Sequence, residues 1–394
     1  MRFVMVGPFG FHPNKTMRSR AMGFARELVK GGHVVKIVMP PWQTPEEAGK
    51  SWVEDGVEIE NVYLSGGIVP IVGRIVRLVR KFQPDVVWGF KPKAYSGLVI
   101  WTLWQTHRWG KRPIFVTDTD DWKGWGGWND IADYSTVQKY FFAWQEKWGM
   151  RHCDLLTYAS RELGDRAASL GISAAKCLYL PNGPGIQTEP IEPEKIEAKR
   201  KELGLGDRPT LLLYSRLFEF DTGRLVAILQ KVQAQLPESV ILTVGAGLFA
   251  EQAAELRGQL SEAGLLSSMI DTGWLEEADL PEMLLAADVG LYLMDDSLLN
   301  RTKCPVKLAD MVALGIPIVA EAVGEVKLYV AEGENGRLHP TGDVDGVASS
   351  IVELLKSQHT RQRMGAAGRE RHHQKFAWRA TSSALVDKLR TSRF

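Results

Sequence analysis

Two successive series of strand-like and helix-like segments are the feature that most limits how this chain can fold. The first series begins with the buried-strand pattern FVMVG (3–7), continues with helical apolar spacing, and reaches the strand pattern HVVKIVMP (33–40). A strand, a glycine-containing loop, a helix and a second strand form the βαβ unit of a parallel sheet. Since parallel sheets bind ligands at the carboxyl ends of their strands, site residues are expected just after the predicted strands.

A second series of the same kind predicts a second domain, with the strand TLLLYSR (210–216) followed by a helix from about 222 to 236. A stretch around 184–209, rich in proline, glycine and charge, separates the two series and is typical of a linker. The 394 residues also exceed what one hydrophobic core usually supports. We therefore expect an α/β protein with two Rossmann-like parallel-sheet domains, at 1–185 and 190–375, that face each other across a cleft.

The composition argues against several classes of protein. Lys and Arg number 48 against 47 Asp and Glu, so no overall positive charge attracts the chain to nucleic acid. The three cysteines (Cys153, Cys177 and Cys304) are far apart, and the histidines form no HExxH motif, which argues against a disulfide framework and a zinc site. A signal-peptide pattern is absent, and no window reaches the roughly 18 uninterrupted apolar residues of a membrane-spanning helix. We expect a cytoplasmic protein that holds neither a metal nor a cofactor.

The stretch KCPVKLADMVALGIPIVAE (303–321) places charges at the start of an apolar helix pattern. Pro305 suits the first turn of a helix, so the free N–H groups of that turn, Lys303 and Lys307 would converge and hold an anion such as a diphosphate. Asp310, about one and a half turns further on, would accept hydrogen bonds from the hydroxyls of a ribose. The alternative stays open that this acid is solvated or a cap and that both lysines are solvated, as most lysines are.

Six motifs follow one another in the second half of the chain: LLLYSRLFEFDTG, VGAG, DTGWLEEADLPEMLLAADVGLYLM, KLADMVALGIPIVAEAVGE, ENGRLHPTGD and FAW. In order and spacing they resemble the donor half of GT-B glycosyltransferases, and the likeness is closest to glycosyltransferase family 4, the group 1 family. The first half is similar only in its pattern, notably in GGHVV and LPNG. The resemblance implies a GT-B fold and a retaining, metal-independent hexosyltransferase of polysaccharide biosynthesis, which moves a sugar from a nucleotide-diphosphate sugar to a glycan or lipid-linked glycan. It also implies that the tail at 376–394 crosses back onto the first domain.

The resemblance assigns roles to residues on the donor side. Arg216 matches the arginine that binds the diphosphate, and Asp310 matches the second Glu of the family's Glu-x7-Glu motif. The other donor-binding residues would form the wall near the diphosphate or hold the base through their backbone: Gly245, Gly247, Thr272, Gly273, Trp274 and Leu275.

The chain departs from the family pattern at two donor positions. The first Glu of the motif falls at Thr302, and the lysine that the family places near Thr222 is absent. A diphosphate leaving group needs positive charge to stabilise it. We therefore predict that Lys307 substitutes for the missing lysine in catalysis, with Lys303 as the second choice.

The family's histidine in the first domain falls within VTDTDDW, where this chain has carboxylates. Asp118, Asp120 or Asp121 would orient an acceptor hydroxyl or accept its proton, and we assign the catalytic role to Asp120. Three acids in a turn before a helix also commonly just cap it. Besides Asp120, the predicted acceptor-side residues come from the loops after two strands: Gly7, Lys15, Asp118, Asp121 and Trp125.

Two features indicate contact with a glycan or a membrane. Nine of the thirteen tryptophans lie between Trp88 and Trp148, where they would stack on sugars, settle at a lipid interface or fill a core. The helix pattern RIVRLVRKF (74–82) is basic and amphipathic, with Arg74, Arg77 and Lys81 along one side, as in helices that lie on anionic membranes. We therefore expect peripheral association with the inner face of the cell membrane.

Two alternative functions stay open at this point. A GT-B sugar-nucleotide epimerase would need acid and base side chains around the sugar and no acceptor site. A non-catalytic homologue that binds a nucleotide sugar or a glycan would be consistent with Thr302 and with the missing lysine.

Overall fold

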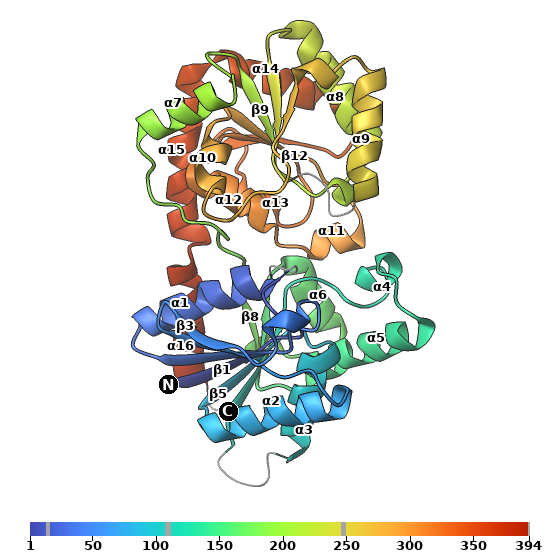
Figure 1. Ribbon diagram of the computed structural model, residues 1–394, viewed down its shortest axis with the longest axis vertical. Coiled ribbons are helices and arrows are strands. Elements are labelled where there is room, and N and C mark those ends of the chain that lie inside the picture. Colours follow the sequence, from blue (N-terminus) through green and yellow to red (C-terminus); the bar gives the residue numbers. More distant parts are fainter. Residues whose placement is uncertain (13–15, 107–111, 246–249, 393–394) are drawn as a thin grey trace. The chain divides into compact units, whose positions relative to one another are not determined.

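The computed structural model describes residues 1–12, 16–106, 112–245 and 250–392 (Figure 1). The chain forms two compact units, each with a sheet of its own. The first unit consists of Met1–Asn182, Thr302–Cys304 and Trp378–Phe394, and the second of Gly183–Arg301 and Pro305–Ala377.

A sheet with the strand order β3-β4-β2-β1-β5-β6-β7-β8 forms the centre of the first unit. Its strands are β1 (Arg2–Val6), β2 (Val34–Met39), β3 (Ser51–Glu54), β4 (Val57–Asn61), β5 (Val86–Phe90), β6 (Ile114–Thr119), β7 (Leu155–Tyr158) and β8 (Cys177–Tyr179). β3 runs antiparallel to β4, and the other pairs are parallel. Phe90 of β5 lies opposite Asp118 of β6, so the loops that follow these two strands leave the sheet side by side.

The helices of the first unit follow the predicted alternation with the strands. They are α1 (Met22–Lys30), α2 (Ile68–Phe82), α3 (Ala94–Thr106), α4 (Trp128–Ile131), α5 (Thr136–Arg151), α6 (Arg161–Ser169) and α16 (Trp378–Thr391). A π-helix, η1 (Met17–Ala21), directly precedes α1, and η2 (Pro45–Glu47) and η3 (Ala174–Lys176) are short 3₁₀ helices. α5 begins with a capping box, in which Ser135 and Gln138 each bond the other's backbone N–H. α2 buries Ile71, Ile75 and Val79 on one side, as its amphipathic spacing predicts.

The second unit contains a fully parallel sheet with the order β11-β10-β9-β12-β13-β14. Its strands are β9 (Thr210–Leu213), β10 (Val240–Thr243), β11 (Met269–Asp271), β12 (Val289–Tyr292), β13 (Ile318–Glu321) and β14 (Gly336–His339). Its helices are α7 (Pro193–Glu202), α8 (Thr222–Gln235), α9 (Ala250–Glu262), α10 (Leu280–Leu285), α11 (Leu298–Thr302, whose last residue groups with the first unit), α12 (Val306–Leu314), α13 (Val326–Tyr329), α14 (Val344–Lys356) and α15 (Gln358–Lys375), with the turns η4 (Leu217–Glu219) and η5 (Leu266–Ser268).

α12 has helix signals at both ends that the sequence displays. Pro305 is its N-cap, with extended backbone, so it lies one residue before the first helical turn in which we placed it. The helix ends at Gly315, whose φ of +80° is a left-handed conformation that glycine adopts without steric cost. Its buried residues include Asp310, an acid within an otherwise apolar run.

The boundary between the two units falls at Asn182, three residues before the predicted end of the first domain at 185. The tail helix α16 belongs to the first unit. Its residue Trp378 packs edge-on against Phe24 of α1, with the ring centroids 4.9 Å apart. The predicted boundaries do not include the short segment Thr302–Cys304, which lies in the middle of the second series but groups with the first unit.

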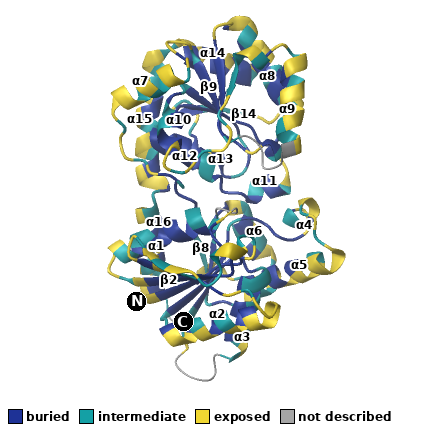
Figure 2. Cartoon of the chain, viewed as in Figure 1, coloured by how far each residue is buried: buried dark blue, intermediate teal, exposed yellow. Residues whose placement is uncertain are grey.

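The central strands of both sheets are among the most buried parts of each unit, whereas edge strands such as β3 and β11 are partly exposed (Figure 2). Both faces of the first sheet are covered by apolar side chains: one core includes Phe3, Met5 and Trp88, and another includes Val4, Val6 and Val87. This alternation along β1 shows why its sequence is a continuous apolar run. Among the described residues, no helix is both long enough and apolar enough to cross a membrane.

Candidate active site

Asp310 of α12 is the central acid of the second unit and is 2% exposed. One of its oxygens accepts a hydrogen bond from the backbone N–H of Gly185 at 2.6 Å, and the other accepts one from the Tyr214 hydroxyl at 3.4 Å. Burial raises the pKa of Asp310 to about 7, although these two hydrogen bonds and Lys307 oppose the rise. Each oxygen of an ionised carboxylate can accept more than one hydrogen bond, so Asp310 has unused capacity for donors such as the hydroxyls of a ribose.

Two cations come from elements near Asp310. Lys307, one turn earlier on α12, lies half-buried with its Nζ 3.4 Å from the carbonyl oxygens of Ser215 and Gly245 and 4.3 Å from the centroid of the Tyr214 ring. Arg216 follows β9 and is exposed. Both cations are thus at the carboxyl end of the sheet, where an anionic ligand of a parallel sheet binds.

Glycines shape the loops after β10 and β11. Gly245 (φ +58°) donates its N–H to the carbonyl of Gly273 at 2.9 Å, and Gly273 (φ +63°) donates to Asp271 at 3.0 Å. Next to them, Trp274 is 68% exposed, while Thr272 and Leu275 are partly buried. The predicted donor residue Gly247 lies outside the described residues.

Two buried hydroxyls at these strand ends escaped the sequence analysis. Ser215 Oγ and Thr243 Oγ1 make no hydrogen bond within the part of the chain that the structure describes. Buried hydroxyls without a partner are uncommon and call for a ligand or a water molecule. Ser and Thr at strand ends are too frequent in sequences for this signal to be found without the fold.

Arg224, the cation nearest in sequence to the absent lysine, is bound elsewhere in the second unit. Its Nη2 lies 2.6 Å from a carboxylate oxygen of Asp295 and 3.0 Å from one of Glu321. Glu321 is fully buried and also accepts from the backbone N–H groups of Met294 and Gly342. Arg224 thus serves to neutralise a buried acid.

Lys303 and Lys307, which the sequence places four residues apart, fall in different units. In the first unit, Thr302 accepts a hydrogen bond from the backbone N–H of Trp122 at 3.3 Å, and its carbonyl accepts one from Ser160 Oγ at 2.8 Å. Lys303 is 7% exposed, with its Nζ 5.8 Å from the centroid of the Trp128 ring. Only Lys307 accompanies Asp310 in the second unit.

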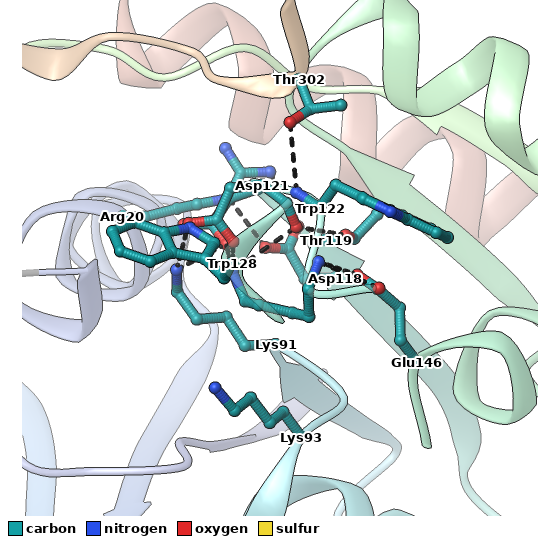
Figure 3. A network of polar contacts seen from close by, with 12 residues as sticks. Arg20, Lys91, Lys93, Asp118, Thr119, Asp121, Trp122, Trp128, Glu146 and Thr302 are labelled. Carbon is teal, nitrogen blue, oxygen red and sulfur yellow. Dashed lines mark hydrogen bonds and ion pairs between the residues drawn. The ribbon is translucent and has the colours of Figure 1, made fainter. Parts of the chain in front are cut away.

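Asp118 has a buried arginine as its partner. Arg20 donates to its two oxygens from Nε at 2.8 Å and from Nη2 at 2.7 Å (Figure 3). Thr157 Oγ1 also donates to Asp118, at 2.6 Å. Arg20 and Asp118 are both at most 1% exposed, and Arg20 also binds the carbonyl of Leu180 and the side chain of Asn182. This bidentate contact holds η1 against the sheet, so the observed contacts of Asp118 stabilise the fold of the first unit.

Asp120 and Asp121 follow β6 and form ion pairs with two lysines that the sequence analysis did not identify. Lys91 Nζ lies 2.9 Å from Asp120 and 3.1 Å from Asp121, and Lys123 also contacts both carboxylates. Trp128 Nε1 donates to Asp121 at 2.8 Å. Burial opposes the ionisation of Asp120, but Lys91, Lys123 and Arg20 outweigh it and hold its pKa below the usual value.

Two of the remaining predicted acceptor-side residues, Gly7 and Trp125, have different surroundings. Gly7 is buried, and a Cβ there would lie 2.9 Å from the end of the Met17 side chain, so a larger residue would require Met17 to move. Trp125 is 46% exposed, and its carbonyl accepts a hydrogen bond from the indole of Trp122 at 2.9 Å. Lys15 lies outside the described residues. Within the described ranges, no group of three or more His, Cys, Asp or Glu residues is placed to hold a metal ion.

Comparison with known proteins identifies related sequences for both units. Residues 16–183 match the family model "Glycosyl transferase 4-like domain", and residues 208–357 match "Glycosyl transferases group 1". The GDP-mannose-dependent alpha-(1-6)-phosphatidylinositol monomannoside mannosyltransferase of Mycolicibacterium smegmatis is 24% identical over 95% of this chain and 94% of its own length. The phosphatidyl-myo-inositol mannosyltransferase of Mycobacterium leprae is 25% identical over 98% of this chain and 96% of its own length.

Solved structures resemble the whole chain. The sucrose-phosphate synthase of Thermosynechococcus elongatus has a TM-score of 0.73 at 18% identity and covers 99% of this chain and 98% of its own. The Anabaena protein HepE, solved in complex with UDP-glucose, has a TM-score of 0.72 at 17% identity, with 99% of this chain and all of its own covered. At these identities the likeness shows a shared fold.

Proposed function

Because the chain belongs to glycosyltransferase family 4 (group 1) and has the GT-B fold, we propose that it is a retaining hexosyltransferase acting on a nucleotide-diphosphate sugar. The acceptor is a glycan or a lipid-linked glycan, and neither a metal ion nor a further cofactor takes part. The observation that carries this proposal is the grouping of Asp310, Lys307 and the exposed Arg216 at the carboxyl end of the second sheet.

On the donor side, Asp310 accepts hydrogen bonds from the ribose, and Lys307 and Arg216 bind the diphosphate. Hydroxyl donors restore the ionised form of a carboxylate that burial has made hard to ionise. When the bond from the sugar to the diphosphate breaks, negative charge grows on the leaving phosphate, and the two cations stabilise it. The exposed ring of Trp274 and the backbone of Thr272 and Gly273 hold the base.

On the acceptor side, Asp120 orients the attacking hydroxyl and receives its proton. Lys91 and Lys123 keep this carboxylate ionised, so it is ready to accept a hydrogen bond. Asp121 is less suited to the role because Lys91 and the indole of Trp128 already bind its Oδ2. No side chain is assigned as a covalent nucleophile.

We also propose that the first unit associates with the anionic inner face of the cell membrane. Apolar and aromatic side chains are exposed along α5 with helical spacing and on the loop before α4: Trp125, Val137, Tyr140, Phe141 and Trp144. Such rings favour the interface of a bilayer. On α2, Arg77 and Lys81 are exposed, whereas Arg74 donates to the carbonyls of Tyr63 and Ser65.

Turnover of nucleotide sugars tests the reaction. The purified chain is incubated with a chelator, with glycan or lipid-linked acceptors, and with a nucleotide sugar. The sugars tested are GDP-mannose, on which the similar mannosyltransferase of Mycolicibacterium smegmatis depends, and UDP-glucose, with which HepE was solved. Release of nucleoside diphosphate with a glycosylated product of unchanged anomeric configuration is expected. Arg216→Ala should abolish release, whereas Arg257→Ala, an exposed arginine of α9, should not. An epimerised donor without transfer, or binding without turnover, would contradict the proposal.

A further inference from the structure

The loop between β5 and α3, Lys91-Pro92-Lys93-Ala94, has an unusual backbone. Lys91 and Ala94 both have φ values of +49°, a left-handed conformation that is unfavourable for residues other than glycine. The loop is held in place by Gln145 of α5, which accepts from the Ala94 N–H at 2.7 Å and donates to the Ala94 carbonyl at 3.1 Å. Ser96 Oγ donates to the carbonyls of Lys91 and Lys93. Backbone strain that the surroundings impose in this way is typical of functional sites.

This loop brings the side chains of Lys91 and Lys93 close together (Figure 3). Lys91 is neutralised by Asp120 and Asp121, which it shares with Lys123. Among the described residues, no carboxylate lies within ion-pair distance of Lys93, whose ammonium contacts the Tyr134 hydroxyl and lies 4.0 Å from the centroid of that ring. Lys93 is therefore a half-buried cation without a countercharge, next to a second cation.

Glu146 is the acid whose charge favours the protonated form of Lys93, but it is only partly ionised near neutral pH and is therefore a weak countercharge. Glu146 is fully buried, and both of its oxygens accept from the backbone N–H of Lys123 at 3.0 Å. Burial raises the pKa of Glu146 to about 7, and burial together with Lys91 lowers the pKa of Lys93 to about 7. Near neutral pH, both groups are thus partly uncharged while the site is empty.

We propose that Lys93, Lys91 and the Tyr134 hydroxyl form a binding site for a phosphate group carried by the acceptor. The three groups supply hydrogen-bond donors, two of them charged, and charge-assisted hydrogen bonds to phosphate are among the strongest in proteins. A bound dianion offsets the repulsion between the two ammonium groups and gives Lys93 a negatively charged partner. The ring centroids of Tyr134 and Phe142 lie 4.0 and 4.6 Å from Lys93 Nζ, so both rings favour the charged form of this lysine. That the phosphate belongs to the acceptor rests on the proposed function, while the anion site itself does not.

A titration of Lys93 itself tests the site. The ε-carbons of the lysines are labelled with ¹³C, the Lys93 signal is assigned with Lys93→Arg, and its pKa is measured with and without sodium sulfate. Sulfate serves as the probe because it does not titrate near neutral pH. We expect saturating sulfate to raise the pKa of Lys93 by one unit or more, which corresponds to tenfold tighter binding to the protonated form. An unchanged pKa at saturating sulfate overturns the proposal. Sulfate bound at the donor side does not confuse this readout.

Variants separate binding at Lys93 from a general loss of positive charge. Lys93→Met keeps the length of the side chain, and we expect it to weaken sulfate binding at least tenfold, read from the signal of Lys91. Lys93→Arg keeps the charge and should bind within a few-fold of the parent. Lys147→Met, at an exposed lysine of α5, is the matched control and should leave sulfate binding unchanged. Equal affinities in Lys93→Met and the parent refute the site.

The source of the phosphate is identified by testing which phosphate compounds shift the Lys93 signal. Glycerol 3-phosphate that shifts the Lys93 signal, when glycerol does not, indicates a soluble phosphorylated acceptor. Vesicles of phosphatidylglycerol that shift it, when phosphatidylcholine vesicles do not, indicate a lipid headgroup. If sulfate binds and neither phosphate source does, the assignment to an acceptor is wrong. None of these arms requires sugar transfer, so their failure and a failure of the transfer assay are distinguishable.

Discussion

Asp310→Asn tests whether burial has made this acid hard to ionise. Asparagine has the same shape, its carbonyl oxygen can accept from the Gly185 N–H, and its amide faces the Tyr214 hydroxyl, so the substitution removes the titration without removing the packing. In the parent, the folded state keeps a proton on Asp310 that the unfolded state releases at ordinary pH. The free energy of unfolding should therefore fall as pH rises through this window in the parent and should lack this fall in the variant.

The size of the effect follows from the pKa of Asp310, which burial raises from 3.8 to about 7. One pKa unit corresponds to about 1.4 kcal/mol, so full titration removes about 4 kcal/mol of stability between the two values. Between pH 5 and pH 8 the accessible part is about 3 kcal/mol, by the same conversion. Above the folded-state pKa the contribution is lost completely, so the advantage of Asp310→Asn over the parent should level off near pH 8.

Urea unfolding at a series of pH values, followed by circular dichroism, measures the difference between parent and variant. All other titrating groups contribute equally to both proteins, so the difference isolates Asp310. Nucleoside diphosphate affinity provides a second readout, in which Asp310→Ala should lose about 1.5–3 kcal/mol of binding because a charged acceptor is removed. Parallel stability curves for the parent and Asp310→Asn would show that Asp310 titrates normally and would refute the reasoning from burial.

Three further outcomes are expected. Lys307→Ala should reduce kcat by a factor on the order of 10² or more, because one cation at the leaving diphosphate is lost, while Lys303→Ala should have a smaller effect; if both turn over like the parent while Arg216→Ala is inactive, Lys307 does not compensate for the absent lysine. Removal of Trp378–Phe394 should lower the melting temperature of the first unit, since each large buried side chain of α16 contributes about 1.5–3 kcal/mol, and unchanged calorimetric melting would contradict this packing. Trp144→Ser should weaken salt-sensitive sedimentation with anionic vesicles, and equal recovery with neutral vesicles would count against the membrane proposal.

The alternation of strands and helices could be predicted because the central parallel strands have apolar side chains on both faces. The helix predicted from about 222 to 236 is α8, Thr222–Gln235, and Asp310 stood out as an acid within an apolar helix. These signals are local, so they are readable along the chain. The resemblance to the family added a predicted diphosphate-binding role for Arg216, which no local pattern shows.

The contacts that surround the acids could not be predicted in the same way. Arg20 and Asp118 are 98 positions apart, and Lys91 and Asp121 are 30 apart. Such pairs depend on which strand ends lie next to each other, a property of the sheet order and not of either segment. The same reason applies to Lys303 and Lys307: they are four positions apart in the sequence, whereas the chain changes units after Cys304.

The short segment Thr302–Cys304 has a consequence for anyone who exchanges domains between members of this family. With it, the chain moves from one unit to the other four times, after residues 182, 301, 304 and 377. In a chimera joined only at the linker, most of the first unit would come from one parent. Thr302, whose hydroxyl accepts from the Trp122 N–H, and α16, which packs against Phe24, would come from the other parent. An exchange meant to transfer donor specificity should therefore take these two segments from the same parent as the rest of the first unit. The functional module is discontinuous in the gene although each unit is compact in space.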